Sequence, residues 1–385
     1  MRRSTRIAVV GAGLGGMTVA GLLQREGFTV KVYEQAPAFS RIGAGIHLSA
    51  NVMKVMRRLG IEQTLVDIGL HPDAFVSRQW DTGDILFELP FDAAAEAHYG
   101  AAYINVHRGD LHAALESALT HGTVAFGHKL KALSLRDDDV LLQFENGTTA
   151  EADIAIGADG VNSKVRDYVL TPEKPRYSGR IAHRAIFPTG LLNGLDIRAC
   201  TKWWGPSSHI LVYYMTQARE EVYVVSAVPA PEWTASEPYL PCDRDSFVGA
   251  FDGYHAELRQ VVAAAPEITV WPVFDRPRVD QWTAGRVALL GDACHAMRPY
   301  MASGAAMAIE DGAILARCIA ERGDTDPAES FAWYEANRMP RTNKVQLISE
   351  ANVWLRQPSD PDWLFMYDAC SVPLLAPEAA PRELE

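Results

Sequence analysis

The sequence has few cysteines, no long basic run and no long apolar run. Its five cysteines are odd in number and show no CxxC or Cys/His ligand spacing, which argues against a disulfide framework and a structural zinc site. We therefore expect no bound metal and a reducing, cytoplasmic environment. No stretch reaches the roughly 18 uncharged apolar residues that a membrane-spanning helix needs.

Positive charge is also scarce. The chain has 36 Lys and Arg against 48 Asp and Glu, a net charge of −12, and no basic stripe that could follow a phosphate backbone. We expect a small-molecule substrate, no nucleic-acid or membrane partner, and a monomer or homodimer. The apolar start resembles a secretion signal only superficially, because its glycines follow a phosphate-loop pattern.

That pattern is TRIAVVGAGLGGMTVAGLLQREGFTVKVYEQ, residues 5–35, which predicts strand, tight turn, helix and strand. Gly11, Gly13 and Gly16 occupy the G-x-G-x-x-G positions, where they permit the turn, the approach of a pyrophosphate and close helix packing. Glu34 ends the second strand, where a carboxylate can accept hydrogen bonds from ribose hydroxyls. The loop by itself does not separate NAD from FAD. Further predicted contacts are Leu14, Gly15 and Gln35.

A second glycine-rich helix start, GDACHAMRPYMASGAAMAIED, spans residues 291–311. A buried strand ends at Gly291 and Asp292, and a helix from about residue 303 begins on small residues, including Gly304 and Ala305, that leave backbone N–H groups accessible. Such a helix N-terminus can stabilise the negative charge of a reduced flavin. Asp292 can bind the hydroxyls of a ribityl chain. NAD lacks a ribityl chain, so the two motifs together favour FAD.

Period-two patterns at residues 78–90 and 179–229 predict a mostly antiparallel sheet that covers the substrate. The predicted fold is α/β, a Rossmann-like FAD-binding domain with this sheet inserted. We assign residues 1–72, 98–175 and 275–355 to the FAD-binding domain, and residues 73–97 and 176–274 to the substrate-binding domain. For the tail, residues 356–385, partial disorder and packing against a partner subunit both stay open.

The motifs GAGLGG, HRGDL, GADGVNSKVR and GDACHAMRP, in this order, resemble those of the single-component, class A flavin-dependent aromatic hydroxylases across roughly residues 5–350. The resemblance implies tightly bound FAD, NADH as a transient reductant without a second Rossmann unit, O2 as co-substrate and a flavin C4a-hydroperoxide. It further implies cofactor contacts from Arg41, Gly45, Arg108, Asp159, Gly160, Asp292 and Pro299. The chain departs from the family at four positions, Ala296, Ala302, Ser303 and Ala306, where Pro, Gly, Gln and Asn are usual.

Three further stretches, GAGIHLSANVMKVMRRLG, YSGRIAHRA and KWWGPSSHILVYY, resemble family members that convert 6-hydroxynicotinate into 2,5-dihydroxypyridine and carbon dioxide. By that resemblance His209 is a base or proton relay, Tyr213 binds the ring hydroxyl and His47 meets the substrate carboxylate. His209 and Tyr213 share one face of a strand, although about 13 Å apart if it is straight. The implied substrate contacts are His47, Cys200, His209, Tyr213 and Met301.

Several alternatives stay open. His209 and Tyr213 could simply decorate a half-buried sheet, and Trp203 and Trp204 could either wall a pocket or serve packing. Cys294 fits a small buried residue, and His295 could merely follow the Gly-Asp turn. A salicylate-type hydroxylase is the alternative within the family. From other classes, an NAD-dependent dehydrogenase and a non-catalytic flavoprotein are the competing interpretations.

Overall fold

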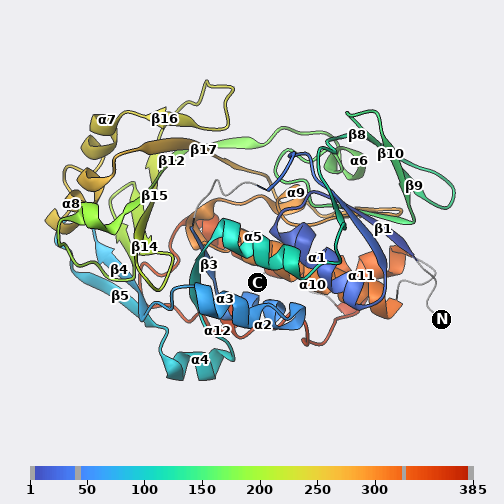
Figure 1. The fold of residues 1–385 in the computed structure, drawn as a ribbon, viewed down its shortest axis with the longest axis horizontal. Coiled ribbons are helices and arrows are strands. Elements are labelled where there is room, and N and C mark those ends of the chain that lie inside the picture. Colours follow the sequence, from blue (N-terminus) through green and yellow to red (C-terminus); the bar gives the residue numbers. More distant parts are fainter. Residues whose placement is uncertain (1–4, 40–44, 323–326, 380–385) are drawn as a thin grey trace.

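A six-stranded sheet forms the centre of the nucleotide-binding part (Figure 1). The computed structural model describes residues 5–39, 45–322 and 327–379. The strand order is β18 (Thr283–Ala284), β19 (Val287–Leu289), β11 (Ile154–Gly157), β1 (Arg6–Val10), β2 (Thr29–Tyr33) and β7 (Val124–Ala125), and all pairs except β18–β19 are parallel. Parallel strands covered on both faces need continuous apolar sequence, which β1 supplies because Ile7 to Val10 are all buried.

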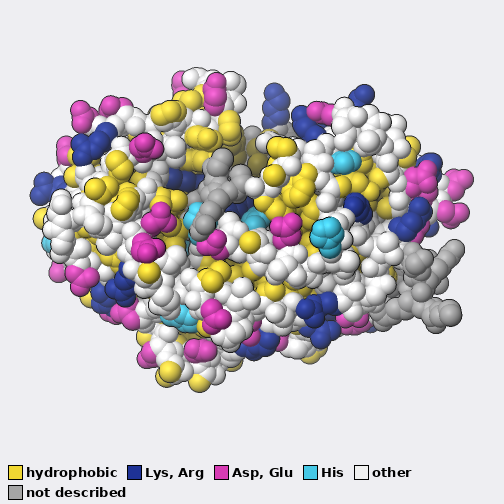
Figure 2. Space-filling view, viewed as in Figure 1, with side chains coloured by type: hydrophobic (Ala, Val, Ile, Leu, Met, Phe, Trp, Pro, Cys, Tyr) yellow, Lys and Arg dark blue, Asp and Glu magenta, His cyan; other side chains and the backbone are white. Residues whose placement is uncertain are grey.

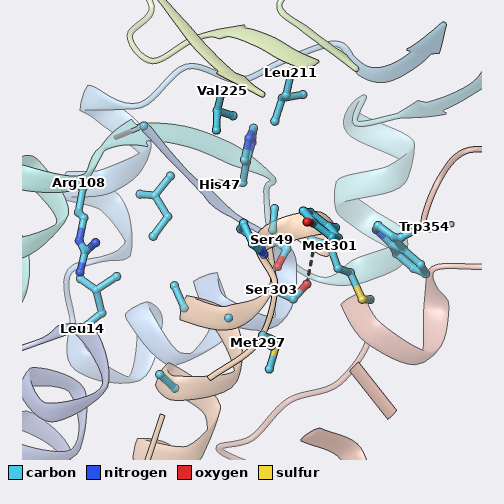
Figure 3. Close-up of a pocket in the computed structure, with 18 of the residues that line it drawn as sticks. Leu14, His47, Ser49, Arg108, Leu211, Val225, Met297, Met301, Ser303 and Trp354 are labelled. Carbon is cyan, nitrogen blue, oxygen red and sulfur yellow. Dashed lines mark hydrogen bonds between the residues drawn. The ribbon is translucent and has the colours of Figure 1, made fainter. Parts of the chain in front are cut away.

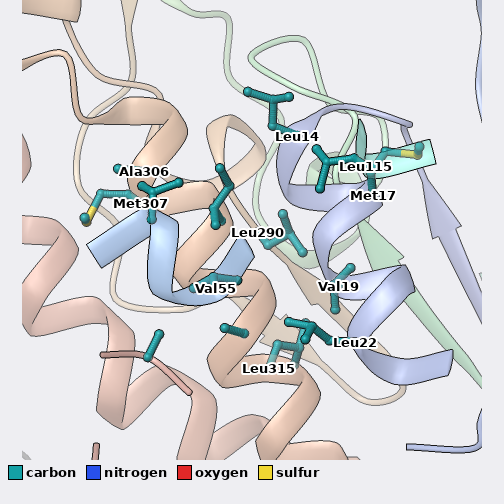
Figure 4. Packing of buried hydrophobic residues seen from close by; sticks show 14 of the residues in the cluster. Leu14, Met17, Val19, Leu22, Val55, Leu115, Leu290, Ala306, Met307 and Leu315 are labelled. Atoms are coloured by element: carbon teal, nitrogen blue, oxygen red, sulfur yellow. The ribbon is translucent and has the colours of Figure 1, made fainter. Parts of the chain in front are cut away.

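Two helices pack closely beside this sheet, α1 (Leu14–Arg25) and α10 (Gly304–Arg322). Figure 4 shows Leu14, Val19 and Leu22 of α1 facing the same core as Leu315 of α10. The close approach requires glycine: a Cβ on Gly15 would lie 2.9 Å from the Ala308 carbonyl oxygen. The surrounding helices are α2 (Ala50–Leu59), α5 (Arg108–Ser117) and α11 (Pro327–Ala351).

The inserted part is an eight-stranded sheet, antiparallel except where β13 pairs with β4. Its order is β16 (Leu240–Cys242), β17 (Ile268–Asp275), β12 (Arg176–Pro188), β15 (Glu221–Pro229), β14 (His209–Tyr214), β13 (Cys200–Trp204), β4 (Ala74–Gln79) and β5 (Ile85–Pro90). α7 (Arg244–Gly249) and α8 (Ala256–Ala264) contribute Phe247 and Leu258 to a separate core with residues of this sheet. The predicted, mostly antiparallel sheet is confirmed.

Shorter elements complete the described chain. β3 (Gly45–Leu48) pairs with β6 (Ile104–His107), and β8 (Leu130–Leu135), β9 (Val140–Phe144) and β10 (Thr149–Ala152) form an antiparallel sheet. The others are α3 (Glu62–Ile68), α4 (Ala93–Tyr99), α6 (Arg166–Val169), α9 (Asp292–His295), α12 (Asp362–Phe365), η1 (Thr189–Leu192), η2 (Pro299–Met301) and η3 (Pro377–Ala379).

The chain after α11 folds back onto its own molecule. Trp354, Leu355, Leu364 and Phe365 are buried, and the Arg317 guanidinium donates to the carbonyl oxygens of residues 369 and 372 at 3.0 and 2.9 Å. The described part of the tail, residues 356–379, therefore packs against its own molecule.

Charge on the surface is mixed. Figure 2 shows acidic and basic side chains interspersed on the visible face, without a large region of one sign. Within the described ranges, no helix has the length and apolar character needed to cross a membrane.

Candidate active site

One cavity of about 420 Å³ connects the N-termini of α1 and α10 with the inner face of the eight-stranded sheet. Figure 3 shows Leu14 and Arg108 on the left of this space, Leu211 and Val225 at the top, and Trp354 on the right. Most of the predicted site residues line it: Gly13, Leu14, Gly15, Gly16, Gly45, His47, Arg108, Gly160, His209, Tyr213, Asp292, Pro299, Met301, Gly304 and Ala305.

Of the remaining predicted nucleotide contacts, Gly11 and Glu34 fix the conformation of the glycine-rich loop before α1. Gly11 has φ +104°, and a Cβ there would lie 2.3 Å from the Ala158 carbonyl oxygen. The Glu34 carboxylate accepts hydrogen bonds from the amides of Ala12 and Ala36, both at 2.8 Å, and so ties the end of β2 to the loop. Its remaining lone pairs are available to a ribose. Gln35 follows Glu34 and does not line the cavity, and Arg41 lies outside the described residues.

Two further predicted contacts, Asp159 and Cys200, do not line the cavity. The Asp159 carboxylate accepts hydrogen bonds from the Ser163 hydroxyl at 2.5 Å and from the amides of Lys164 and Val165. It therefore holds the turn before α6, with Gly160 left to face the cavity. Cys200 is fully buried beside Tyr213 on the paired strand, where burial raises the pKa of its thiol, and it does not line the cavity.

The polar groups along the cavity fit FAD. α1 begins after Gly13 without a side-chain cap, and its first intrahelical bond runs from the Met17 amide, so the preceding amides can bind a diphosphate. At α10 the first such bond runs from the Met307 amide, which leaves the amides of residues 304–306 for the flavin end. Arg108 is exposed to the cavity and interacts electrostatically with Asp292.

The loop before α10 explains one departure from the family pattern. Ala302 lies in the left-handed region with φ +52°. Glycine reaches this conformation without steric cost, and glycine is the residue usual in the family at this position. The chain therefore keeps the turn while carrying alanine.

His47 lines the cavity and carries a buried acceptor nitrogen without a partner in the described chain. The Asn105 amide nitrogen donates to the Tyr214 carbonyl oxygen at 3.1 Å, so the Asn105 amide oxygen faces His47 Nδ1 at 2.7 Å. Because that oxygen only accepts, Nδ1 carries the proton and Nε2 does not. Nε2 has no hydrogen-bond partner in the described chain. Burial lowers the pKa of His47 to about 4, so the ring is neutral at neutral pH.

Tyr213 lies against His47, with ring centroids 4.4 Å apart. Burial raises the pKa of its phenol well above the usual value, so the hydroxyl stays protonated and can donate. Its ring lies directly on Gly45, where a Cβ would approach the ring to 2.5 Å. Position 45 therefore requires glycine, because the Tyr213 ring leaves no room for a side chain.

His209 lies at the other end of the same strand face. The His209 ring packs edge-on against the Tyr300 ring, with the two ring centroids 5.1 Å apart. Its Nδ1 lies 3.3 Å from the Asn352 amide nitrogen. Burial lowers the pKa of His209 well below its usual value, with Lys202 and Arg180 adding to the effect. β14 has no bulge in its pairing with β13, and His209 and Tyr213 make no hydrogen bond with each other. Both line the cavity with Leu211 between them.

A buried ionic network stabilises the loop of residues 291–303, which precedes α10 at the flavin end of the cavity. The Arg338 guanidinium donates to Asp311 at 2.7 Å and to Glu310 at 2.8 Å, and all three side chains are fully buried. Asp311 also accepts from the Gly291 amide at 3.1 Å and lies 2.5 Å from His295 Nε2. His295 therefore anchors the turn and does more than follow it. Burial opposes ionisation of Asp311, but His295 and Arg338 outweigh it and lower the pKa of the carboxyl.

Cys294, His295 and Asp311 are close enough together to hold a metal ion. Asp311 is already occupied by Arg338, His295 and the Gly291 amide. Burial raises the pKa of the Cys294 thiol well above its usual value, which opposes the thiolate that a metal requires. The cluster is therefore a structural support of the loop.

The buried histidines make the protein sensitive to acid. His47 and His183 have pKa values of about 4 in the fold because of burial, against about 6.5 when unfolded. The unfolded chain thus takes up these protons first. We expect the contribution of these histidines to the free energy of unfolding to be constant above about pH 6.5 and to fall below it, by up to about 3 kcal/mol per histidine near pH 4. Urea unfolding between about pH 7.5 and 5 measures this, and a flat profile contradicts it.

Sequence reasoning missed the cavity residues Arg184, Lys202, Tyr300 and Trp354. It also missed Asn105, which hydrogen-bonds His47 from outside the cavity lining. Asn105 is a polar residue between the apolar residues Ile104 and Val106 of β6. Lys202 is the one charged residue of β13. Both are signals of a site inside a sheet. Trp203 and Trp204 are packing residues outside the cavity, in agreement with one of the two alternatives for them.

A family model described as an FAD binding domain matches residues 4–348. The chain belongs to this family and is an FAD-dependent aromatic monooxygenase. Over 380 residues it is 49% identical to 6-hydroxynicotinate 3-monooxygenase of Pseudomonas fluorescens, covering 98% of this chain and 99% of the relative. A 3-amino-4-hydroxybenzoate 2-monooxygenase of Streptomyces cremeus is 38% identical over 89% of this chain and 85% of its own length.

Among solved structures, a variant of HpxO from Klebsiella pneumoniae complexed with FAD matches with a TM-score of 0.79 and 25% identity, over 90% of this chain and 89% of that one. These similarities confirm the predicted family, fold class and FAD dependence.

Proposed function

We propose that the protein converts 6-hydroxynicotinate, NADH, O2 and two protons into 2,5-dihydroxypyridine, carbon dioxide, NAD+ and water. One oxygen atom of O2 replaces the carboxylate at ring carbon 3, and the other leaves as water. The names of the relatives at 49 and 48% identity support this substrate. The structural observation that carries the proposal is the neutral His47, which lines the cavity beside Tyr213 and whose unprotonated Nε2 has no hydrogen-bond partner in the described chain.

His47 activates the ring in this proposal. Nε2 accepts the hydrogen bond of the substrate's 6-hydroxyl group and draws its proton away from the oxygen, which makes the ring more electron-rich. The carbon para to that hydroxyl is C3, which bears the carboxylate. His47 thus takes the role that the sequence suggested for His209, and the Tyr213 hydroxyl donates to the same substrate oxygen.

Bound FAD supplies activated oxygen at the flavin end of the cavity. The chain's part is to orient the ring and exclude water, because water beside the reactive centre diverts the reaction to hydrogen peroxide. Leu211, Val225, Trp354 and Phe365 supply apolar walls. His209 lies near the opposite end from His47, where it can form a polar boundary of the site with Tyr300.

Gly45 tests the placement of Tyr213. In Gly45→Ala we expect kcat/KM for 6-hydroxynicotinate to fall by about 10- to 100-fold, because the methyl group displaces the Tyr213 ring. Steady-state kinetics on FAD-loaded enzyme measures it. Gly249→Ala is the matched control, since a Cβ there meets nothing within 4 Å. Equal kinetics for the two variants would remove Tyr213 from the proposed site.

The substrate is tested by NADH oxidation with 6-hydroxynicotinate, salicylate, 4-hydroxybenzoate or no acid. We expect yellow purified protein, the strongest stimulation by 6-hydroxynicotinate and none by salicylate. Stimulation by salicylate instead would favour the salicylate-type alternative. A colourless protein would fit a dehydrogenase, and yellow protein that oxidises NADH with none of these acids would fit a non-catalytic flavoprotein.

A further inference from the structure

Lys202 is a buried cation without an anionic partner. It lies on β13 opposite Leu211 of β14, a cavity residue, and lines the same cavity with only 4% of its surface exposed. Nζ donates to the Tyr300 carbonyl oxygen at 3.0 Å and lies 3.8 Å from the centroid of the Trp204 ring. An ammonium has three protons to donate. In the described ranges no carboxylate lies within ion-pair distance of this group.

Such an arrangement is costly without a ligand. A charged group taken out of water needs an opposite charge and full hydrogen bonding to recover its hydration. Burial lowers the pKa of Lys202 to about 7, and His209, its neighbour, is neutral. An anion entering the cavity would restore the full positive charge. The site is therefore built for a ligand with a negative group.

The other cations of the cavity have different surroundings. Arg108 interacts electrostatically with Asp292. Arg184 lies on β12 with its guanidinium over the Trp271 ring at 4.6 Å. Only Lys202 is joined to the loop that carries Tyr300 and Met301, next to the sheet face of His209, Leu211 and Tyr213.

We propose that Lys202 binds the substrate carboxylate and selects ring acids whose hydroxyl and carboxylate groups lie opposite one another. This rests on the proposed function. His47 and Tyr213 hold the hydroxyl. Lys202 is paired with Leu211, which lies two residues, or about 7 Å, from Tyr213 along β14. A para-substituted ring spans a comparable distance. Salicylate, whose two groups are adjacent, does not reach both partners.

The same geometry fits the name of the Streptomyces cremeus relative, since the hydroxyl and carboxylate of a 4-hydroxybenzoate are also para to each other. The inference therefore concerns the spacing of the two groups and not the ring nitrogen.

The test compares two ligands that differ only by the carboxylate. Dissociation constants of 6-hydroxynicotinate and 2-hydroxypyridine are measured by flavin absorbance on FAD-loaded wild type and Lys202→Met. We expect the variant to bind 6-hydroxynicotinate at least about 30-fold more weakly, the usual effect of removing one partner of a buried charged pair. Binding of 2-hydroxypyridine should change less than about threefold. FAD content checks folding, and Lys202→Gln gives the same comparison if the Met variant loses FAD.

Arg184→Met is the matched variant, because it removes another cavity cation. If the preference for the carboxylate survives in both Lys202 variants, or is lost in Arg184→Met and kept in Lys202→Met, the assignment is overturned. Failure of the proposed function looks different: wild type would then ignore 6-hydroxynicotinate. In that case 4-hydroxybenzoate and phenol form the ligand pair, and loss of the carboxylate preference in Lys202→Met still supports the role of Lys202.

Discussion

His47→Gln is expected to lower kcat for 6-hydroxynicotinate by about 10²- to 10⁴-fold, the usual contribution of a positioned acid or base, while FAD stays bound. His47 lines the cavity and donates from Nδ1 to Asn105, and this leaves Nε2 as an unpaired acceptor. A glutamine can keep one hydrogen bond but is not a base. The measurement is product formation in a single turnover with pre-reduced enzyme and O2, which separates chemistry from NADH binding.

His183→Gln is the control for this variant. His183 is also buried and neutral, but it lies on β12 of the eight-stranded sheet, packs against Phe247, hydrogen-bonds Ser226 and does not line the cavity. We expect its kcat to stay within about threefold of wild type, because surroundings outside the site are preserved. An equal loss in both variants would mean that the fold, and not the acceptor nitrogen, accounts for the effect.

The second large effect concerns stability. Arg338→Met should lower the free energy of unfolding by about 3–5 kcal/mol, because it leaves two buried carboxylates without their shared cation. Glu310 keeps Arg341 and Asn51, whereas Asp311 keeps only His295 and the Gly291 amide. Since Asp311 holds the Gly291 turn, we also expect weaker FAD binding.

Urea unfolding at a fixed excess of FAD measures the change, since bound cofactor itself adds stability. Lys344→Met on the same helix is the control, as Lys344 is exposed and should cost less than about 1 kcal/mol. A loss below about 1 kcal/mol in Arg338→Met would contradict a supporting role for the network.

The cofactor end of the site was predictable because its signals are local. The GAGLGG turn, α1 and Glu34 follow one another within 30 residues, and the glycines are required by backbone contacts such as that of Gly11 with Ala158. The start of α10 could likewise be placed from its small residues. Even so, Glu34 and Asp159 hold their loops through hydrogen bonds to particular backbone amides. The spacing of residues in the sequence does not show which amides these are.

The substrate end depends on pairing between distant strands. His47 and Asn105 are 58 residues apart and meet only because β3 pairs with β6, and the same pairing fixes the tautomer of His47. Sequence showed that His209 and Tyr213 share a strand face. It could not show that Tyr213 faces His47 while His209 faces Tyr300, nor that Lys202 enters the cavity between them.

The most direct test of the central claim is the stoichiometry of the reaction with 6-hydroxynicotinate. Product, carbon dioxide and hydrogen peroxide are quantified against NADH consumed by the FAD-loaded enzyme. The proposed function predicts equal amounts of 2,5-dihydroxypyridine, carbon dioxide and NAD+, with little peroxide. NADH consumption that ends in peroxide without dihydroxypyridine or carbon dioxide would contradict it.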